Sequence, residues 1–403
     1  MASNCGEGGE MLTQYDEYPV HQSPYPFSEI PSTDMAWCDG YFFGLYSAKA
    51  KVFFFSGIRV SPNTDMIGGY GGVSVDGRQY TARFSRPWRS NPDTAVGPLS
   101  YRFVEPLKKV HLALDPNDSD LTFDFDWIGV GDCYLEPHHT AWSRGRKTTD
   151  QSRYNQSGTA NGWIELDGQR WDLNETEWAG SRDHSWGLYA NRPPLLPDLK
   201  WLPPPEAPAV RQGMRWAAWW GAGEVSGFFS VHESEDGRQI QMNDVFGTPL
   251  EGGIDYGFDG PQKKLAAARH ELEFRPGTRI LSKGTWHFTD DSGGEWKQVY
   301  VPASPGWNPV TIGYGAGSWK DGGSVYTYHG VDGLVQEYDD FDFSKQPYDH
   351  KLYNGIEIKG IHNQEYLAEV TTIDPTGRET VGSAHVELFI PGRFDPYDFE
   401  RPG

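Results

Sequence analysis

The sequence of 403 residues contains only three cysteines, Cys5, Cys38 and Cys133. Their number is odd, they lie far apart and no Cys-x-x-Cys pair occurs, so a disulfide framework and a zinc site are both disfavoured. No uncharged apolar run approaches the ~20 residues that cross a bilayer, which predicts no membrane insertion. The glycine-rich, acidic N-terminus lacks the basic and apolar regions of a signal peptide. We therefore expect a cytoplasmic protein.

Positive charge is also scarce, with 35 Lys and Arg against 56 Asp and Glu, a formal net charge of −21. Nucleic acids and anionic membranes both favour clustered basic side chains. We therefore expect neither as a partner, and interpret the acidic surface as solubilising.

Motifs that bind cofactors or build known catalytic centres are missing. There is no GxxxxGK[ST] phosphate loop, no strand–GxGxxG–helix unit, no GxSxG elbow and no HExxH pair. Kinase, dehydrogenase, serine hydrolase and metalloprotease functions lose support. Chemistry in this chain is therefore expected to need no cofactor and no metal, and to use acid–base groups in an apolar pocket.

Long helical patterns are nearly absent, and Lys263–Leu272, the best candidate, could equally be a strand. Aromatics make up 14% of the chain, beside 48 Gly and 29 Pro, which favours short strands joined by tight turns. Strand-like runs occur at Lys51–Val60, Gly71–Phe84, Leu121–Val130, Met214–His232, Arg279–Phe288 and Ala384–Ile390. Runs at this density, without intervening helices, predict an all-β protein of antiparallel sandwiches or barrels.

The dipeptide Asp167-Gly168 predicts a hairpin whose register can be written out, because Asp-Gly suits a type I′ turn. It pairs Leu166 with Gln169, Glu165 with Arg170, and Ile164 with Trp171. One face is then mostly apolar and the other carries an opposed ion pair, as an amphipathic hairpin requires.

Seven prolines fall within Pro193–Pro208, a segment that can form neither a central strand nor a helix. We interpret it as the connection between two β domains. The predicted division is an irregular segment 1–34, a first domain 35–205 that ends in this linker, a second domain 206–394 and a tail 395–403. A long surface loop inside one domain is the alternative.

Ser181–Gly187 holds Arg182, Asp183, His184 and Trp186, groups that are costly to bury unless they satisfy one another. On a strand, Arg182, His184 and Trp186 would share one face, and Asp183 and Ser185 the other. A bulge would let Asp183 and His184 meet. The structural alternative is an Arg–Asp clamp with a tryptophan plug.

Two further polar groups are candidates. His138 and His139 follow Glu136; adjacent histidines diverge on a strand and make a poor metal pair, but one could reach a cavity. In Tyr154–Gly158, Tyr154 or Gln156 could orient a substrate oxygen. Satisfied structural histidines and ordinary turn chemistry are the alternatives.

Aromatic residues exceed what a core needs, so some could line a pocket for a large apolar ligand or stabilise a cationic intermediate. They include Trp37, Tyr41, Phe42, Phe53, Phe54, Phe55, Trp216, Trp219 and Trp220.

The segment Gly180–Gly187 resembles the RDHSWG signature of proteins related to carotenoid 1,2-hydratase (hydroxyneurosporene synthase). Tyr154–Gly162, Gly162–Glu165 and Trp37–Phe42 fit the same context, so the likeness covers residues 35–190 well and the rest loosely. It implies two lipocalin-like antiparallel β-barrel domains packed together. The hydratases of this group add water to an isolated C=C bond without a cofactor, fungal relatives guide pericyclic cyclisations such as Diels–Alder reactions, and others have no known activity.

The leading hypothesis is a cofactor-independent hydratase or dehydratase acting on a hydrophobic alkene or alcohol, such as a terpenoid or polyketide. Asp183 and His184 are the expected acid and base, and Arg182 would hold the carboxylate. The residues expected to contact the substrate are Trp37, Tyr41, His139, Tyr154, Gln156, Arg182 and Trp186. An isomerase or cyclase acting on a polyene, and a non-enzymatic carrier of a hydrophobic ligand, remain alternatives.

Overall fold

The structure is a computed structural model and describes residues 30, 32–88, 93–143, 145–189, 212–240, 249–305, 307–361 and 365–400. Its regular elements there are strands and short 3₁₀ helices, so the all-β prediction is confirmed. The predicted linker Pro193–Pro208 lies outside the described residues. Among those residues, no helix has the length and apolar character to span a membrane.

The strands of the N-terminal half are β1 (Trp37–Ser47), β2 (Val52–Ser61), β3 (Met66–Val75), β4 (Arg78–Pro87), β5 (Ala95–Val96), β6 (Leu99–Glu105), β7 (Lys109–Leu114), β8 (Leu121–Gly129), β9 (Tyr134–Leu135), β10 (His139–Ser143), β11 (Arg146–Leu166), β12 (Gln169–Leu173) and β13 (Ala179–Tyr189).

The strands of the C-terminal half are β14 (Met214–Ala222), β15 (Val225–Glu233), β16 (Leu250–Asp255), β17 (Gln262–Phe274), β18 (Leu281–Asp290), β19 (Glu295–Pro302), β20 (Val335–Asp342), β21 (Tyr348–Lys351), β22 (Glu357–Ile361), β23 (Glu365–Ile373) and β24 (Glu379–Phe389). The 3₁₀ helices are η2 (Pro62–Thr64), η3 (Pro309–Ile312) and η4 (Asp395–Tyr397).

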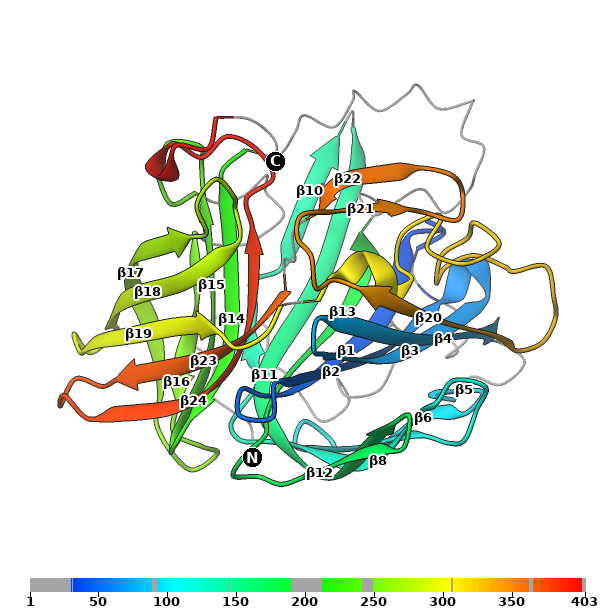
Figure 1. Cartoon of the computed structure of the whole chain (residues 1–403), viewed down its shortest axis with the longest axis horizontal. Helices are drawn as coiled ribbons and strands as arrows, with labels where there is room; N and C mark the ends of the chain where they lie inside the picture. The colour runs from blue at the N-terminus through cyan, green and yellow to red at the C-terminus, as the bar shows by residue number, and fades with distance from the viewer. Residues whose placement is uncertain are drawn as a thin grey trace.

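Two large sheets organise these strands (Figure 1). The C-terminal sheet closes into a barrel in the order β14-β15-β16-β17-β18-β19-β23-β24. The N-terminal sheet has 14 strands and curls into a half-barrel, with β20 and β5 at the ends of its path. Arg86 on β4 links two distant strands of this sheet, because its Nε donates to the carbonyl of Ala95 on β5 over 2.9 Å. Lys263–Leu272 lies within strand β17.

Each sheet encloses its own aromatic core. Tyr41, Phe43, Trp127 and other apolar side chains fill the half-barrel. Trp216, Trp286 and their neighbours fill the closed barrel. Burying such rings supplies roughly 1.5–3 kcal/mol each and drives both sheets to curl around them.

The hairpin at Asp167-Gly168 has the predicted register, with Leu166 opposite Gln169 and Ile164 opposite Trp171. Asp167 and Gly168 both have positive φ, at 51° and 77°, as a type I′ turn requires. Local turn chemistry was therefore sufficient to predict this part of the fold.

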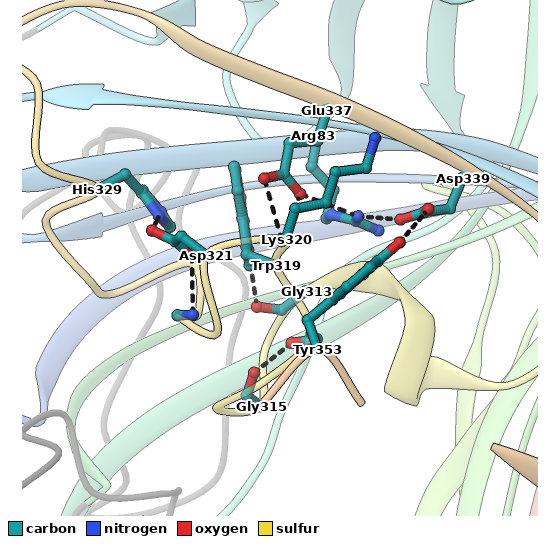
Figure 2. A network of polar contacts seen from close by, with 12 residues as sticks. Arg83, Gly313, Gly315, Trp319, Lys320, Asp321, His329, Glu337, Asp339 and Tyr353 are labelled. Atoms are coloured by element: carbon teal, nitrogen blue, oxygen red, sulfur yellow. Dashed lines mark hydrogen bonds and ion pairs between the residues drawn. The ribbon is translucent and has the colours of Figure 1, made fainter. Parts of the chain in front are cut away.

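Strand β20 crosses between the two halves: it comes from the C-terminal half but pairs antiparallel with β4. Figure 2 shows how its segment is anchored, by the fully buried Arg83, which pairs with Glu337 and Asp339. The hydroxyl of Tyr353 donates to Asp339 over 2.6 Å, and the guanidinium carbon of Arg83 lies 5.7 Å from the Trp319 ring. The N-terminal sheet therefore contains chain from both halves, and the boundaries proposed from the sequence stay a prediction.

Candidate functional site between the half-barrel and the barrel

Strand β13, which carries the Ser181–Gly187 segment, pairs with β1 and β11 without any shift of register between Gly180 and Leu188. No bulge interrupts the alternation, so Asp183 and His184 point to opposite faces. Arg182, His184 and Trp186 face the interior of the half-barrel. Ser181, Asp183 and Ser185 face the other way, where Ser181 Oγ lies 3.2 Å from Nδ1 of His385 on β24. The two expected catalytic residues are therefore not brought together.

Inside the half-barrel, His184 pairs with a carboxylate that the sequence did not single out. Its Nε2 lies 2.7 Å from Oδ1 of Asp39, and both side chains are fully buried. Tyr41 stacks on the imidazole with ring centroids 4.1 Å apart, and Tyr154 and Trp186 approach it at 5.3 and 5.1 Å. An imidazole enclosed in this way holds β1 against β13.

Arg182 lies in the same interior and does not share a face with Asp183. Its Nε donates to Oε1 of Gln156 over 2.8 Å. Its guanidinium carbon stands 5.0 Å from the Trp127 ring and 5.4 Å from the Tyr154 ring. Arg182 and Gln156 thus form a buried polar link between β13 and β11, and Arg182 does not hold the Asp183 carboxylate.

The other residues that were expected to contact a substrate do not lie together. Trp37 is buried at the start of β1 opposite Leu188. His138 contacts Asp150 and Ser152, whereas His139 turns away and lies 3.0 Å from Oε2 of Glu136. The two histidines diverge, as their adjacency predicts.

A buried Ser–His–Glu set lies between the half-barrel and the barrel. His385 Nε2 lies 2.8 Å from Oε2 of Glu365 on β23, and His385 Nδ1 faces Ser181 Oγ. None of the three side chains is appreciably exposed. The half-barrel supplies the hydroxyl and the barrel supplies the imidazole and the carboxyl, so the set exists only where the two sheets meet.

Aromatic rings enclose the His385 imidazole. Trp219 stacks on it with centroids 4.9 Å apart, and Phe53 meets it edge-on at 4.8 Å. Phe42 and Trp307 complete the wall at 5.8 and 6.2 Å. These rings exclude water and present π faces to any positive charge that forms beside them.

This environment disfavours the charged forms of both titratable members of the set. Burial, together with the charge of Arg215, lowers the pKa of His385 to about 3. Burial and the neighbouring carboxylate of Glu387 raise the pKa of Glu365 well above its usual range. A carboxyl whose pKa is raised and an imidazole whose pKa is lowered therefore lie in hydrogen-bond contact, a pairing suited to proton transfer.

A second carboxyl, Asp183, shares this face. Burial raises its pKa, although Arg153 on β11 opposes the shift. Burial alone would also raise the pKa of Glu136, but Arg153 and His139 hold it below its usual range. The face thus combines a carboxyl whose pKa is lowered with carboxyls whose pKa values are raised, the separation of pKa values on which acid–base catalysis depends.

A group of potential metal ligands includes two members of the Ser–His–Glu set. Ligand atoms of Glu365, His385 and Glu387 lie within 4.8 Å of one another, close enough to hold a metal ion. Arg215 on β14, however, pairs with Glu387 through its guanidinium. A metal ion would have to compete there with a fixed positive charge.

A small cavity of about 20 Å³, room for roughly one water molecule, opens on the same layer. Its lining includes Tyr134, Asn155 and Phe228. Asn155 Oδ1 accepts a hydrogen bond from Trp219 Nε1 over 3.3 Å, so Trp219 connects this cavity to His385. Asp255 also lines it, and burial raises the pKa of that carboxyl to about 6.

No curated protein matches the chain. Among solved structures, CghA with Sch210972 shares 9% identity over 93% of this chain and 95% of that chain, with a TM-score of 0.47. Kievitone hydratase from Nectria haematococca shares 9% identity over 87% and 88%, with a TM-score of 0.40. Likenesses at this level carry no information about activity.

A protein of Nitrosomonas europaea described as a candidate AttH shares 8% identity over 87% of this chain and 92% of that chain, with a TM-score of 0.45. A family described as a family of unknown function (DUF8625) matches residues 12–364. That match covers most of the sequence, and the chain therefore belongs to this family.

Proposed function

We propose that this protein is a cofactor-independent acid–base enzyme of the hydratase or dehydratase type. Its substrate would be a hydrophobic alkene or alcohol, such as a terpenoid or polyketide, bound between the half-barrel and the barrel. One observation carries the proposal: the carboxyl of Glu365, whose pKa is raised, and the imidazole of His385, whose pKa is lowered, lie 2.8 Å apart inside an aromatic wall.

The chemistry follows from these two states. In dehydration, a carboxylic acid donates its proton to the substrate hydroxyl, the C–O bond breaks and water leaves. The rings around His385 stabilise the positive charge that develops on carbon. A base then removes a proton from the neighbouring carbon, the C=C bond forms and the acid recovers its proton. Hydration is the same sequence in reverse, and neither direction needs an oxidant or reductant.

We assign the acid to Glu365, with Asp183 as the second carboxyl on the same face, and the base to His385. Ser181 is placed to orient a substrate or water oxygen, because its hydroxyl contacts the imidazole. His184 then has a structural role: it faces the interior of the half-barrel and contacts Asp39.

The test uses Glu365→Gln with Glu369→Gln as its matched control, since Glu369 is exposed on the same strand. Native mass spectrometry of freshly purified protein identifies a retained ligand, which is then incubated with the protein in ¹⁸O-labelled water. We expect ¹⁸O exchange or loss of water with the wild type and Glu369→Gln, and a fall of about 10²-fold or more with Glu365→Gln. Full activity in Glu365→Gln would refute the assignment.

Rearrangement without gain or loss of water would instead favour an isomerase or cyclase. Retention of the ligand without any conversion would favour a carrier.

A further inference from the structure

A patch of buried polar atoms without hydrogen-bond partners lies beside Asp183, on the same face of the half-barrel. Ser185 Oγ, Arg59 Nε and both amide atoms of Gln151 make no hydrogen bond. All three residues are at most 4% exposed. Arg153, directly opposite Ser185, likewise has an Nε without a hydrogen-bond partner. Buried polar groups are almost always satisfied, so unsatisfied side chains gathered on one face call for a partner from outside the protein.

The ladder places these three side chains next to one another. Ser185 stands opposite Gly40, which stands opposite Arg59. Directly opposed residues share a face, and a Cβ at Gly40 would lie 3.0 Å from Arg59 Cζ, so the guanidinium reaches across Gly40 towards Ser185. Gln151 faces the same side from β11, one pair further along the ladder.

Arg59 is a charged member of the patch, and its contacts are unusual for a buried guanidinium. Nη1 donates to Cys38 Sγ over 3.1 Å, and the guanidinium carbon stands 5.1 Å from the ring of Tyr314. Among the residues that the structure describes, no carboxylate forms an ion pair with it. Its charge does act on Asp183, where it opposes the rise that burial causes in the pKa of that carboxyl. A buried charge without a counter-ion in direct contact is costly, and a bound anion would offset that cost.

A cover closes this patch from the C-terminal half. The hydroxyl of Tyr314 lies 2.7 Å from that of Tyr70, and Val325 packs over Gly68, which stands opposite Arg59. Further along, the same segment is fixed by the network around Arg83 and Trp319 (Figure 2). The patch therefore lies under a segment held at both edges, as a closed ligand site would.

We propose that Arg59, Ser185 and Gln151 bind the carboxylate of an otherwise hydrophobic ligand. The guanidinium supplies the countercharge, and the Ser185 hydroxyl and Gln151 amide supply two further donors. The inference rests on the proposed function, because it gives the substrate an acidic end. Ser185 follows Asp183 by two residues on the same face, about 7 Å along the strand, so the apolar remainder would extend past Asp183 towards His385.

The experiment compares two fluorescent probes, 11-(dansylamino)undecanoic acid and its methyl ester, titrated into the full chain at neutral pH. The two differ only in the charge of the end group. We expect the acid to bind at least about tenfold more tightly than the ester. Arg59→Met should reduce the affinity for the acid to that for the ester and leave the ester unchanged. Arg170→Met, which removes an exposed guanidinium from the β12 hairpin, should change neither.

Ser185→Ala tests whether weaker binding of the acid could result from loss of folding. It removes a hydroxyl that bonds to nothing, so the melting temperature should not fall, while affinity for the acid should drop several-fold. Equal binding of acid and ester, or undiminished acid binding by Arg59→Met, would overturn the inference. Glu365→Gln should still bind the acid, so a failure of turnover and a failure of carboxylate binding are separate results.

Discussion

Replacing Glu365 with Gln should change how the stability of the protein depends on pH, and the size of that change follows from the structure. The buried carboxyl keeps its proton in the native state, because burial and Glu387 raise its pKa. In the unfolded chain it ionises near its ordinary pKa of about 4.3. Above that pH the native state binds one proton more than the unfolded state, so stability falls as pH rises.

The free energy of unfolding should therefore fall by about 1.4 kcal/mol for each pH unit, or by about 2.7 kcal/mol between pH 5 and pH 7. Gln is nearly isosteric with the protonated acid and has no proton to lose, so Glu365→Gln should not show this loss of stability. Urea unfolding of the wild type, Glu365→Gln and Glu369→Gln at a series of pH values measures it. As pH rises, the free energy of unfolding of Glu365→Gln should increase relative to that of the wild type. The difference between Glu369→Gln and the wild type should stay constant. Parallel curves for all three would show that Glu365 is ionised in the native state.

Three further predictions concern other residues. Asp183→Asn should abolish turnover of the retained ligand while circular dichroism and melting temperature stay close to those of the wild type; retained activity would remove Asp183 from the mechanism. His184→Phe should cost about 3 kcal/mol in urea unfolding, because it deletes the buried imidazole that contacts Asp39, yet folded protein should keep its turnover. Arg83→Met leaves two acidic partners on β20 without their guanidinium and should cost about 3–5 kcal/mol; a loss below 1 kcal/mol would contradict the anchoring role.

Local chemistry made part of this structure predictable. The turn at Asp167-Gly168 fixed its hairpin register, because two residues with positive φ admit few geometries. Strict alternation along β13 separated Asp183 from His184 once no bulge intervened. Both properties depend on residues that are neighbours in the sequence.

Contacts between distant segments were not predictable in this way. His385 reaches Ser181 across 204 positions, and nothing in the composition around Glu365 or His385 marks them as a pair. The isolated carboxylate Asp39 gave a weak signal, since it lies on an otherwise apolar strand. Pairing of β20 with β4 and closure of only one sheet depend likewise on long-range packing.

We propose that the layer between the half-barrel and the barrel holds an uncharged acid beside an uncharged base. Infrared difference spectroscopy of wild type minus Glu365→Gln at pH 7 tests it most directly, because a protonated carboxyl and a carboxylate absorb in separate regions. We expect a carbonyl stretching band of a protonated carboxylic acid in the wild type that Glu365→Gln lacks. A carboxylate band in its place would contradict the claim.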